Sequence, residues 1–73
     1  MKRVVQQRFI DHGIIAVVRY EGMYMVETWD EITEELSILD YYEFSSRNED
    51  IVALQLAERY FVGLERISDN QIQ

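Results

Sequence analysis

The stretch that decides the fold of this chain is IIAVVRYEGMYMVETW, residues 14–29. Two runs rich in β-branched and aromatic residues, which favour strands, flank Glu21-Gly22. Gly22 can adopt the positive φ angle that a tight turn requires. The stretch therefore predicts a β-hairpin, and placing Tyr20 opposite Met23 sets its register. The further cross-strand pairs are Val18 with Met25, Ala16 with Glu27 and Ile14 with Trp29.

Both faces of this hairpin are largely apolar. The face opposite to these pairs carries Ile15, Val17, Arg19, Tyr24, Val26 and Thr28. A two-stranded sheet is marginal in water, and one with two apolar faces needs cover on both sides. That cover comes either from helices of the same chain or from a partner chain.

The segment before the hairpin, residues 3–11, is compatible with a short helix, a strand or a frayed arm. In a helix, Val5 and Phe9 would lie four residues apart on one face, and Gly13 would end the helix.

A helix is predicted over residues 30–39, after the hairpin. Thr28-x-x-Glu31 has the spacing of a capping box, in which two side chains satisfy each other's backbone donors. A helix that begins near Asp30 gives an apolar stripe of Ile32, Leu36 and Leu39. The run Tyr41-Tyr42-Glu43-Phe44 favours a strand by propensity. Residues 41–45 therefore stay open between helix and a third strand.

A second helix is predicted from Glu49 to Phe61 or further, because Ser46-x-x-Glu49 forms another capping box. Its apolar arc is wider than one sheet face can cover, which indicates a central helix or a helix in a dimer interface. The apolar positions are Val52, Leu54, Leu56, Ala57, Tyr60, Phe61, Leu64 and Ile67.

These elements predict a small α+β protein in which residues 1–73 form a single compact domain. The expected architecture is a β-hairpin, with or without a third short strand, packed with two to three α-helices. A chain this short buries only about 60% of the surface that its unfolded form exposes. The sequence has no cysteine for disulfides, so packing or self-association must supply the remaining stability. A homodimer is expected.

Charge is the most informative bulk property, because the net charge of −7 is unevenly spread. Residues 21–50 carry ten acidic side chains and a single arginine, Arg47. Such a segment repels phosphate backbones and anionic membranes and attracts basic partners, so no direct nucleic-acid binding is expected. The apolar runs are far shorter than the roughly 20 residues of a membrane span. Gln6-Gln7-Arg8 interrupts any signal-peptide core. A cytoplasmic protein with no membrane contact is expected.

The sequence shows no catalytic equipment. His12 beside Asp11 has the form of an assisted general base, but no serine or threonine is a compelling nucleophile for it. Isolated glycines exclude a phosphate-binding loop. The dense carboxylates of residues 30–35 match neither the EF-hand loop nor the Glu-x-x-His pattern. We expect no enzyme activity, no metal and no cofactor.

Two remaining features suit protein binding. On a helix, carboxylates three or four residues apart lie about 5–6 Å from one another, a spacing comparable to successive phosphates, so the acidic segment is a candidate nucleic-acid mimic. Aromatic residues also exceed what a small core needs, and such residues are enriched at interface centres. The predicted partner-binding residues are Asp30, Glu31, Glu34, Glu35, Asp40, Glu43, Tyr20, Tyr24 and Tyr41.

The leading hypothesis is a small acidic protein-binding module that inhibits or regulates a basic nucleic-acid-handling protein. A phage or mobile-element antagonist of a host defence would have this character. The alternative is a homo-oligomeric structural or assembly protein with no separate ligand, which associates through the hairpin edges and the broad helix face. An ordinary acidic surface that keeps a small protein in solution would explain the same charge.

Overall fold

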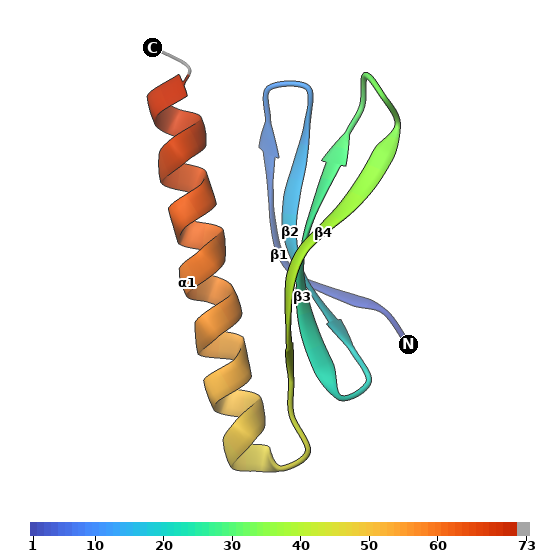
Figure 1. The fold of residues 1–73 in the computed structure, drawn as a ribbon, viewed down its shortest axis with the longest axis vertical. Helices are drawn as coiled ribbons and strands as arrows, with labels where there is room; N and C mark the ends of the chain where they lie inside the picture. Colours follow the sequence, from blue (N-terminus) through green and yellow to red (C-terminus); the bar gives the residue numbers. More distant parts are fainter. Residues whose placement is uncertain (72–73) are drawn as a thin grey trace.

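The computed structural model describes residues 1–71, which form one four-stranded antiparallel sheet and one helix (Figure 1). The strands lie in the order β1-β2-β3-β4, a meander in which each strand pairs with its neighbours in sequence. The elements are β1 (Arg3–Ile10), β2 (Gly13–Tyr20), β3 (Met23–Asp30), β4 (Glu35–Glu43) and α1 (Arg47–Gln71). The sheet is strongly twisted, and α1 runs alongside it (Figure 1).

The predicted hairpin is confirmed as β2 and β3. Tyr20 pairs with Met23, and the register continues to Ile14 opposite Trp29 as the sequence predicts. Gly22 has a φ angle of 77°, which an L-residue with a side chain rarely adopts. The turn therefore fixes which side chains of both central strands face the same side of the sheet.

The predicted packing of the hairpin with two to three helices is wrong, because residues 30–39 form no helix. Residues 31–34 form a turn, and residues 35–43 form β4, which pairs with β3 along its length. Thr28 is not a helix cap: it lies inside central strand β3, between Ile15 of β2 and Ser37 of β4. Asp30 instead stabilises the turn, since its Oδ1 accepts bonds from the N–H groups of Ile32 and Thr33 at 2.9 and 3.2 Å.

Residues 3–11 take the strand alternative, as edge strand β1. The two edge strands of the sheet, β1 and β4, each contain an irregularity in register. One lies between Val4 and Gln6 of β1, and the other lies opposite Val26 and Glu27 of β3, where β4 holds an extra residue, Leu39. Gly13 begins β2 and lies close against β3, since a Cβ there would clash with the Trp29 carbonyl oxygen.

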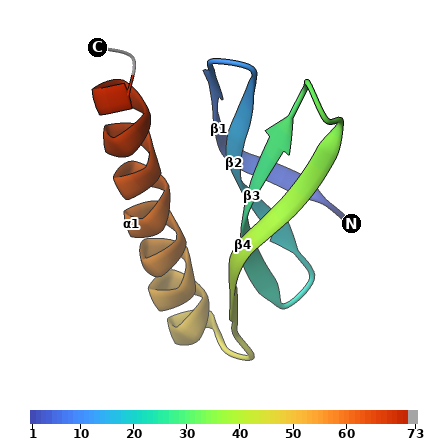
Figure 2. The ribbon, with the colours of Figure 1, turned by 45° about the horizontal axis from the view of Figure 1, so that its top comes forward.

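Helix α1 begins where the second capping box predicts. The Glu49 N–H donates to Ser46 Oγ at 3.2 Å, and the Glu49 carboxylate accepts the N–H of Ser45 at 3.0 Å. The helix continues well beyond Phe61 and covers one face of the sheet, while the other face carries no element of the described chain (Figures 1 and 2). The core between helix and sheet consists of Ile15, Val17, Tyr24, Val26, Ala53, Ala57 and Phe61.

Polar contacts fix both ends of α1 to the sheet. Near its start, Asp50 accepts bonds from the Tyr24 hydroxyl at 2.5 Å and from Arg19 Nη2 at 3.0 Å. Near its end, Arg8 of β1 donates to Asp69 at 2.6 Å and to Glu65 at 3.1 Å. Burial and the bond to Asp50 both raise the pKa of the Tyr24 hydroxyl above its ordinary value.

Phe61 is expected to be the most sensitive core position, because its ring is fully buried between α1 and the sheet. Phe61→Ala should lower the free energy of unfolding by about 3–5 kcal/mol, which is close to the whole stability of a small domain. Phe61→Leu should retain the fold at a loss of about 1 kcal/mol. Denaturant unfolding measures both changes. Val62→Ala, at the exposed neighbouring position, serves as control, and a loss there equal to that of Phe61→Ala would contradict this packing.

Alkaline pH should destabilise the fold through Tyr24. Its pKa is raised in the folded state, so the stabilising contribution is complete below the unfolded value of about 10 and is lost as the pH rises through the folded value. The free energy of unfolding should therefore fall above about pH 10. Tyr24→Phe should make that fall shallower, although the variant is less stable at neutral pH. An unchanged slope in denaturant titrations across this range would contradict the expected linkage.

Candidate binding surfaces

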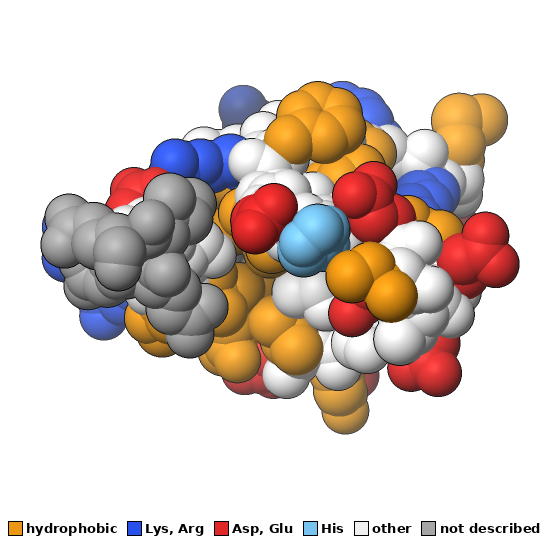
Figure 3. Space-filling model, turned by 90° about the horizontal axis from the view of Figure 1, so that it is seen from above, with side chains coloured by type: hydrophobic (Ala, Val, Ile, Leu, Met, Phe, Trp, Pro, Cys, Tyr) orange, Lys and Arg blue, Asp and Glu red, His pale blue; other side chains and the backbone are white. Residues whose placement is uncertain are grey.

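Five acidic side chains gather at one end of the sheet, where two strand turns lie side by side. We call this group the acidic end, and it consists of Asp11, Asp30, Glu31, Glu34 and Glu35. The Glu31 N–H donates to the His12 carbonyl oxygen at 2.9 Å, which joins the β3–β4 turn to the β1–β2 turn. Viewed from this end, the histidine lies among acidic side chains, with apolar side chains beside them (Figure 3).

The acidic end has little internal charge compensation. His12 lies 3.6 Å from Asp11 and 4.0 Å from Glu31, and His12 carries charge only when protonated. Among the side chains of residues 1–69, which the structure describes, no lysine or arginine forms an ion pair with these five carboxylates. The sign of the potential at this end is therefore negative at neutral pH.

The other predicted partner-binding residues are spread over the molecule. Asp40 lies on the helix-facing side of β4, where its carboxylate accepts the Tyr42 hydroxyl at 3.2 Å. Glu43 ends β4 at the opposite end of the sheet from the acidic end. Tyr41 is exposed, Tyr20 is half-buried, and Tyr24 is a core residue with 3% of its surface exposed. The nine residues therefore do not form one continuous surface.

A second candidate surface is the side of the sheet that α1 leaves uncovered, which we call the open face. It draws mainly apolar side chains from all four strands, and most of its charge lies in Lys2, Glu27 and Glu43. Its residues are Lys2, Val4, Gln7, Phe9, Ile14, Ala16, Val18, Tyr20, Met23, Met25, Glu27, Trp29, Leu36, Ile38, Tyr41 and Glu43. An apolar surface of this breadth is uncommon on a monomeric protein and typically marks an interaction site.

The open face is hollowed in its middle by a depression of about 300 Å³. Small side chains, Ala16 and Val18, lie at its floor, and Trp29 and Leu36 stand at one side. Phe9 projects beside it with 72% of its surface exposed. The face thus combines a hole with a neighbouring projection.

Glu27 is the one buried charged residue among the described side chains, with 4% of its surface exposed. It lines the depression on the open face, where Tyr20 donates to Oε1 at 3.2 Å and Lys2 Nζ lies 3.4 Å from Oε2. The Glu27 carboxylate raises the pKa of the Lys2 ammonium above its ordinary value. The ammonium therefore stays protonated at neutral pH and offsets the buried negative charge.

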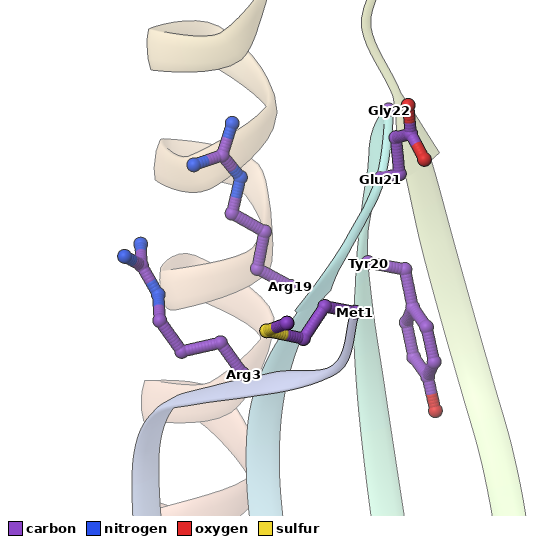
Figure 4. Close-up of a pocket in the computed structure, with 6 residues that line it drawn as sticks. All are labelled: Met1, Arg3, Arg19, Tyr20, Glu21 and Gly22. Carbon is purple, nitrogen blue, oxygen red and sulfur yellow. The ribbon is translucent and has the colours of Figure 1, made fainter.

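Another hollow, of about 340 Å³, lies near the β2–β3 turn. Arg3 and Arg19 extend from neighbouring strands toward the side on which α1 lies, and the Tyr20 ring points away from them (Figure 4). Arg19 is held by Asp50 and lies over the rings of Tyr24 and Phe44, 5.7 and 5.3 Å from their centroids. Arg19 therefore connects the helix to the sheet, and this structural role accounts for its position without a bound ligand.

The described residues contain neither a metal-binding cluster nor a membrane-spanning helix. No group of three or more histidine, aspartate or glutamate side chains within them is arranged to hold a metal ion. No described helix is both long enough and apolar enough to cross a bilayer.

No protein-family model, curated protein or solved structure matches this chain. The surfaces of the molecule itself are therefore the basis for inferring its function.

The sequence predicts an apolar hairpin face that needs cover, but it does not predict that β4 extends this face, although the signal for the strand is present. Leu36-Ser37-Ile38 alternates with the two-residue period of a strand. Leu39, the extra residue in β4, interrupts this alternation and creates the three- and four-residue spacing of a helix stripe. A bulged strand and an amphipathic helix are hard to separate by periodicity over so few residues.

The ion pair on the open face gives an asymmetric prediction. Lys2→Met should lower the free energy of unfolding by about 1 kcal/mol, because the buried Glu27 carboxylate loses its partner. Glu27→Met should leave the stability unchanged or raise it, since an apolar side chain of similar size replaces a buried charge and frees the half-exposed Lys2. Denaturant unfolding of both variants makes the comparison. Equal losses in the two variants would contradict a buried carboxylate held by Lys2.

Proposed function

We propose that this chain is a small acidic protein-binding module that regulates or inhibits a basic nucleic-acid-handling protein. The observation that carries the proposal is the acidic end, five carboxylates that two joined turns present without lysine or arginine partners among the described residues. Uncompensated charge of one sign accelerates association with a surface of the opposite sign and disfavours like-charged competitors.

The shape of the acidic end supports recognition of a protein surface. Its carboxylates lie on or beside two turns that a backbone hydrogen bond joins, with exposed apolar side chains such as Ile32 beside them. Interfaces typically combine a desolvated apolar centre with a charged rim. A basic groove with apolar patches is the kind of partner surface that such an end complements.

The proposal does not depend on nucleic-acid mimicry by a helix. The regular spacing expected of Glu31, Glu34 and Glu35 on a helix is absent, because they lie on a turn and at the start of β4. What supports an antagonist is charge concentration alone, which would compete with phosphates for the same lysine and arginine side chains.

The test is a reversal of charge at the acidic end in the triple variant Glu31→Lys, Glu34→Lys and Glu35→Lys. The matched control, Glu21→Lys, Glu58→Lys, Asn48→Lys and Gln55→Lys, raises the net charge by the same amount at positions outside both the acidic end and the open face. Tagged wild-type and variant chains are used to capture proteins from the native host's lysate, with washes at low and high salt. All three chains are first checked for folding by thermal unfolding.

We expect wild type and control to retain one basic nucleic-acid-handling protein that high salt removes, and the acidic-end variant to lose it. Titration of the purified partner should show affinity reduced by about 100-fold or more in that variant, as for truncation of close charge pairs. The chain should also displace a DNA or RNA duplex from this partner. Equal retention by all three chains, or equal loss from both variants, would refute binding through the acidic end.

A further inference from the structure

We infer that the open face binds the open face of a second copy, so that two chains form a symmetric dimer with their helices on the outside. This inference goes beyond the proposed function and does not depend on it, because the acidic end and the open face are different surfaces. It commits the chain to an isologous contact in which the same residues of both copies meet.

The amount of exposed surface supports a missing layer. A folded monomer of 8.8 kDa exposes about 4,800 Å² by the general scaling of area with mass, whereas this chain exposes 5384 Å². Its radius of gyration is 12.7 Å, against about 11 Å for a compact domain of this length. The excess of about 600 Å² per copy, or about 1,200 Å² for two, reaches the lower limit of the area that stable interfaces bury.

The shape of the open face, with a depression beside a projecting side chain, favours binding of a second copy. The depression of about 300 Å³ lies beside the projecting Phe9 on the same face. In a dimer with a two-fold axis, the projection of each copy can fill the depression of the other, so that two equivalent contacts form. The Phe9 ring of each copy would enter the depression of its partner, which Val4, Trp29 and Leu36 line together with the more deeply buried Ala16 and Val18.

The other routes to self-association are less favourable. Both edge strands carry irregularities, between Val4 and Gln6 in β1 and at Leu39 in β4, and bulges at edges hinder pairing with another strand. The exposed apolar residues of α1, such as Val52 and Leu56, form narrow strips beside charged positions. The open face is broader and charge-poor, as the centres of homodimer interfaces are.

Charge sets the relative direction of the two copies. The acidic end lies at one end of the sheet, and the β2–β3 turn lies at the other. An antiparallel arrangement of the two sheets places the two acidic ends far apart and so avoids repulsion between them. The dimer would then present one acidic end at each extremity, which allows two partner molecules to bind at once.

The experiment compares the same substitution on two surfaces by sedimentation equilibrium of the purified protein. Leu36→Arg changes the open face, where Leu36 is 52% exposed, and Leu56→Arg changes α1, where Leu56 is 42% exposed. Phe9→Arg provides a second open-face variant in case Leu36→Arg does not fold, and circular dichroism establishes the fold of each chain. Wild type and Leu56→Arg should be dimers. Folded open-face variants should have a dimer dissociation constant raised by about 100-fold or more.

Two outcomes would overturn the inference. A wild-type chain that stays monomeric at millimolar concentration has no such interface. A dimer that Leu56→Arg dissociates, while Phe9→Arg leaves it intact, associates through the helix instead. Neither result bears on the acidic end, because the charge reversals at Glu31, Glu34 and Glu35 are measured with a separate partner.

Discussion

The register of the β2–β3 hairpin is the constraint on which the rest of this structure depends. The positive φ of Gly22 fixes a tight turn, and that turn sends alternate residues of two apolar strands to opposite sides of the sheet. One helix can cover only one of those sides. Because Ile15, Val17 and Val26 face α1, Ala16 and Val18 must lie on the side that no other element of residues 1–71 covers. The core and the open face are thus two results of a single turn.

Much of the fold could be predicted from sequence where one local signal dominated. The hairpin, its register and the start of α1 follow from glycine, from strand propensity and from a capping box. The prediction is wrong at residues 30–39, where two local signals favour a helix: the spacing of a capping box and the apolar stripe of Ile32, Leu36 and Leu39. Thr28-x-x-Glu31 has capping spacing, yet pairing on both sides of β3 removes Thr28 from any helix end. Tertiary hydrogen bonding overrides local preference here, as it commonly does for short segments.

The candidate sites were also predictable only in part, because tertiary pairing decides the secondary structure on which they lie. The concentration of acidic residues is a property of composition and does not depend on whether the segment is a helix or a strand. Four of the six carboxylates predicted to bind a partner, Asp30, Glu31, Glu34 and Glu35, therefore still lie together at the acidic end. The regular helical spacing predicted for them is a property of secondary structure and is absent from the observed turn and strand. Tyr24 shows the limit most clearly, because an aromatic residue on a two-faced hairpin belongs to the core or the surface according to which face the helix covers. That choice requires long-range contacts that no local pattern encodes.

The bond between the Glu31 N–H and the His12 carbonyl has a consequence for how the acidic end would bind. Loops that must be ordered on association lose conformational freedom, and that loss subtracts directly from affinity. Here the hydrogen bond already joins the β1–β2 and β3–β4 turns in the free protein. The Asp30 carboxylate stabilises the β3–β4 turn by accepting bonds from the N–H groups of Ile32 and Thr33. The backbone that carries the carboxylates is therefore preorganised, and little of the binding free energy that their charge provides is lost in ordering it.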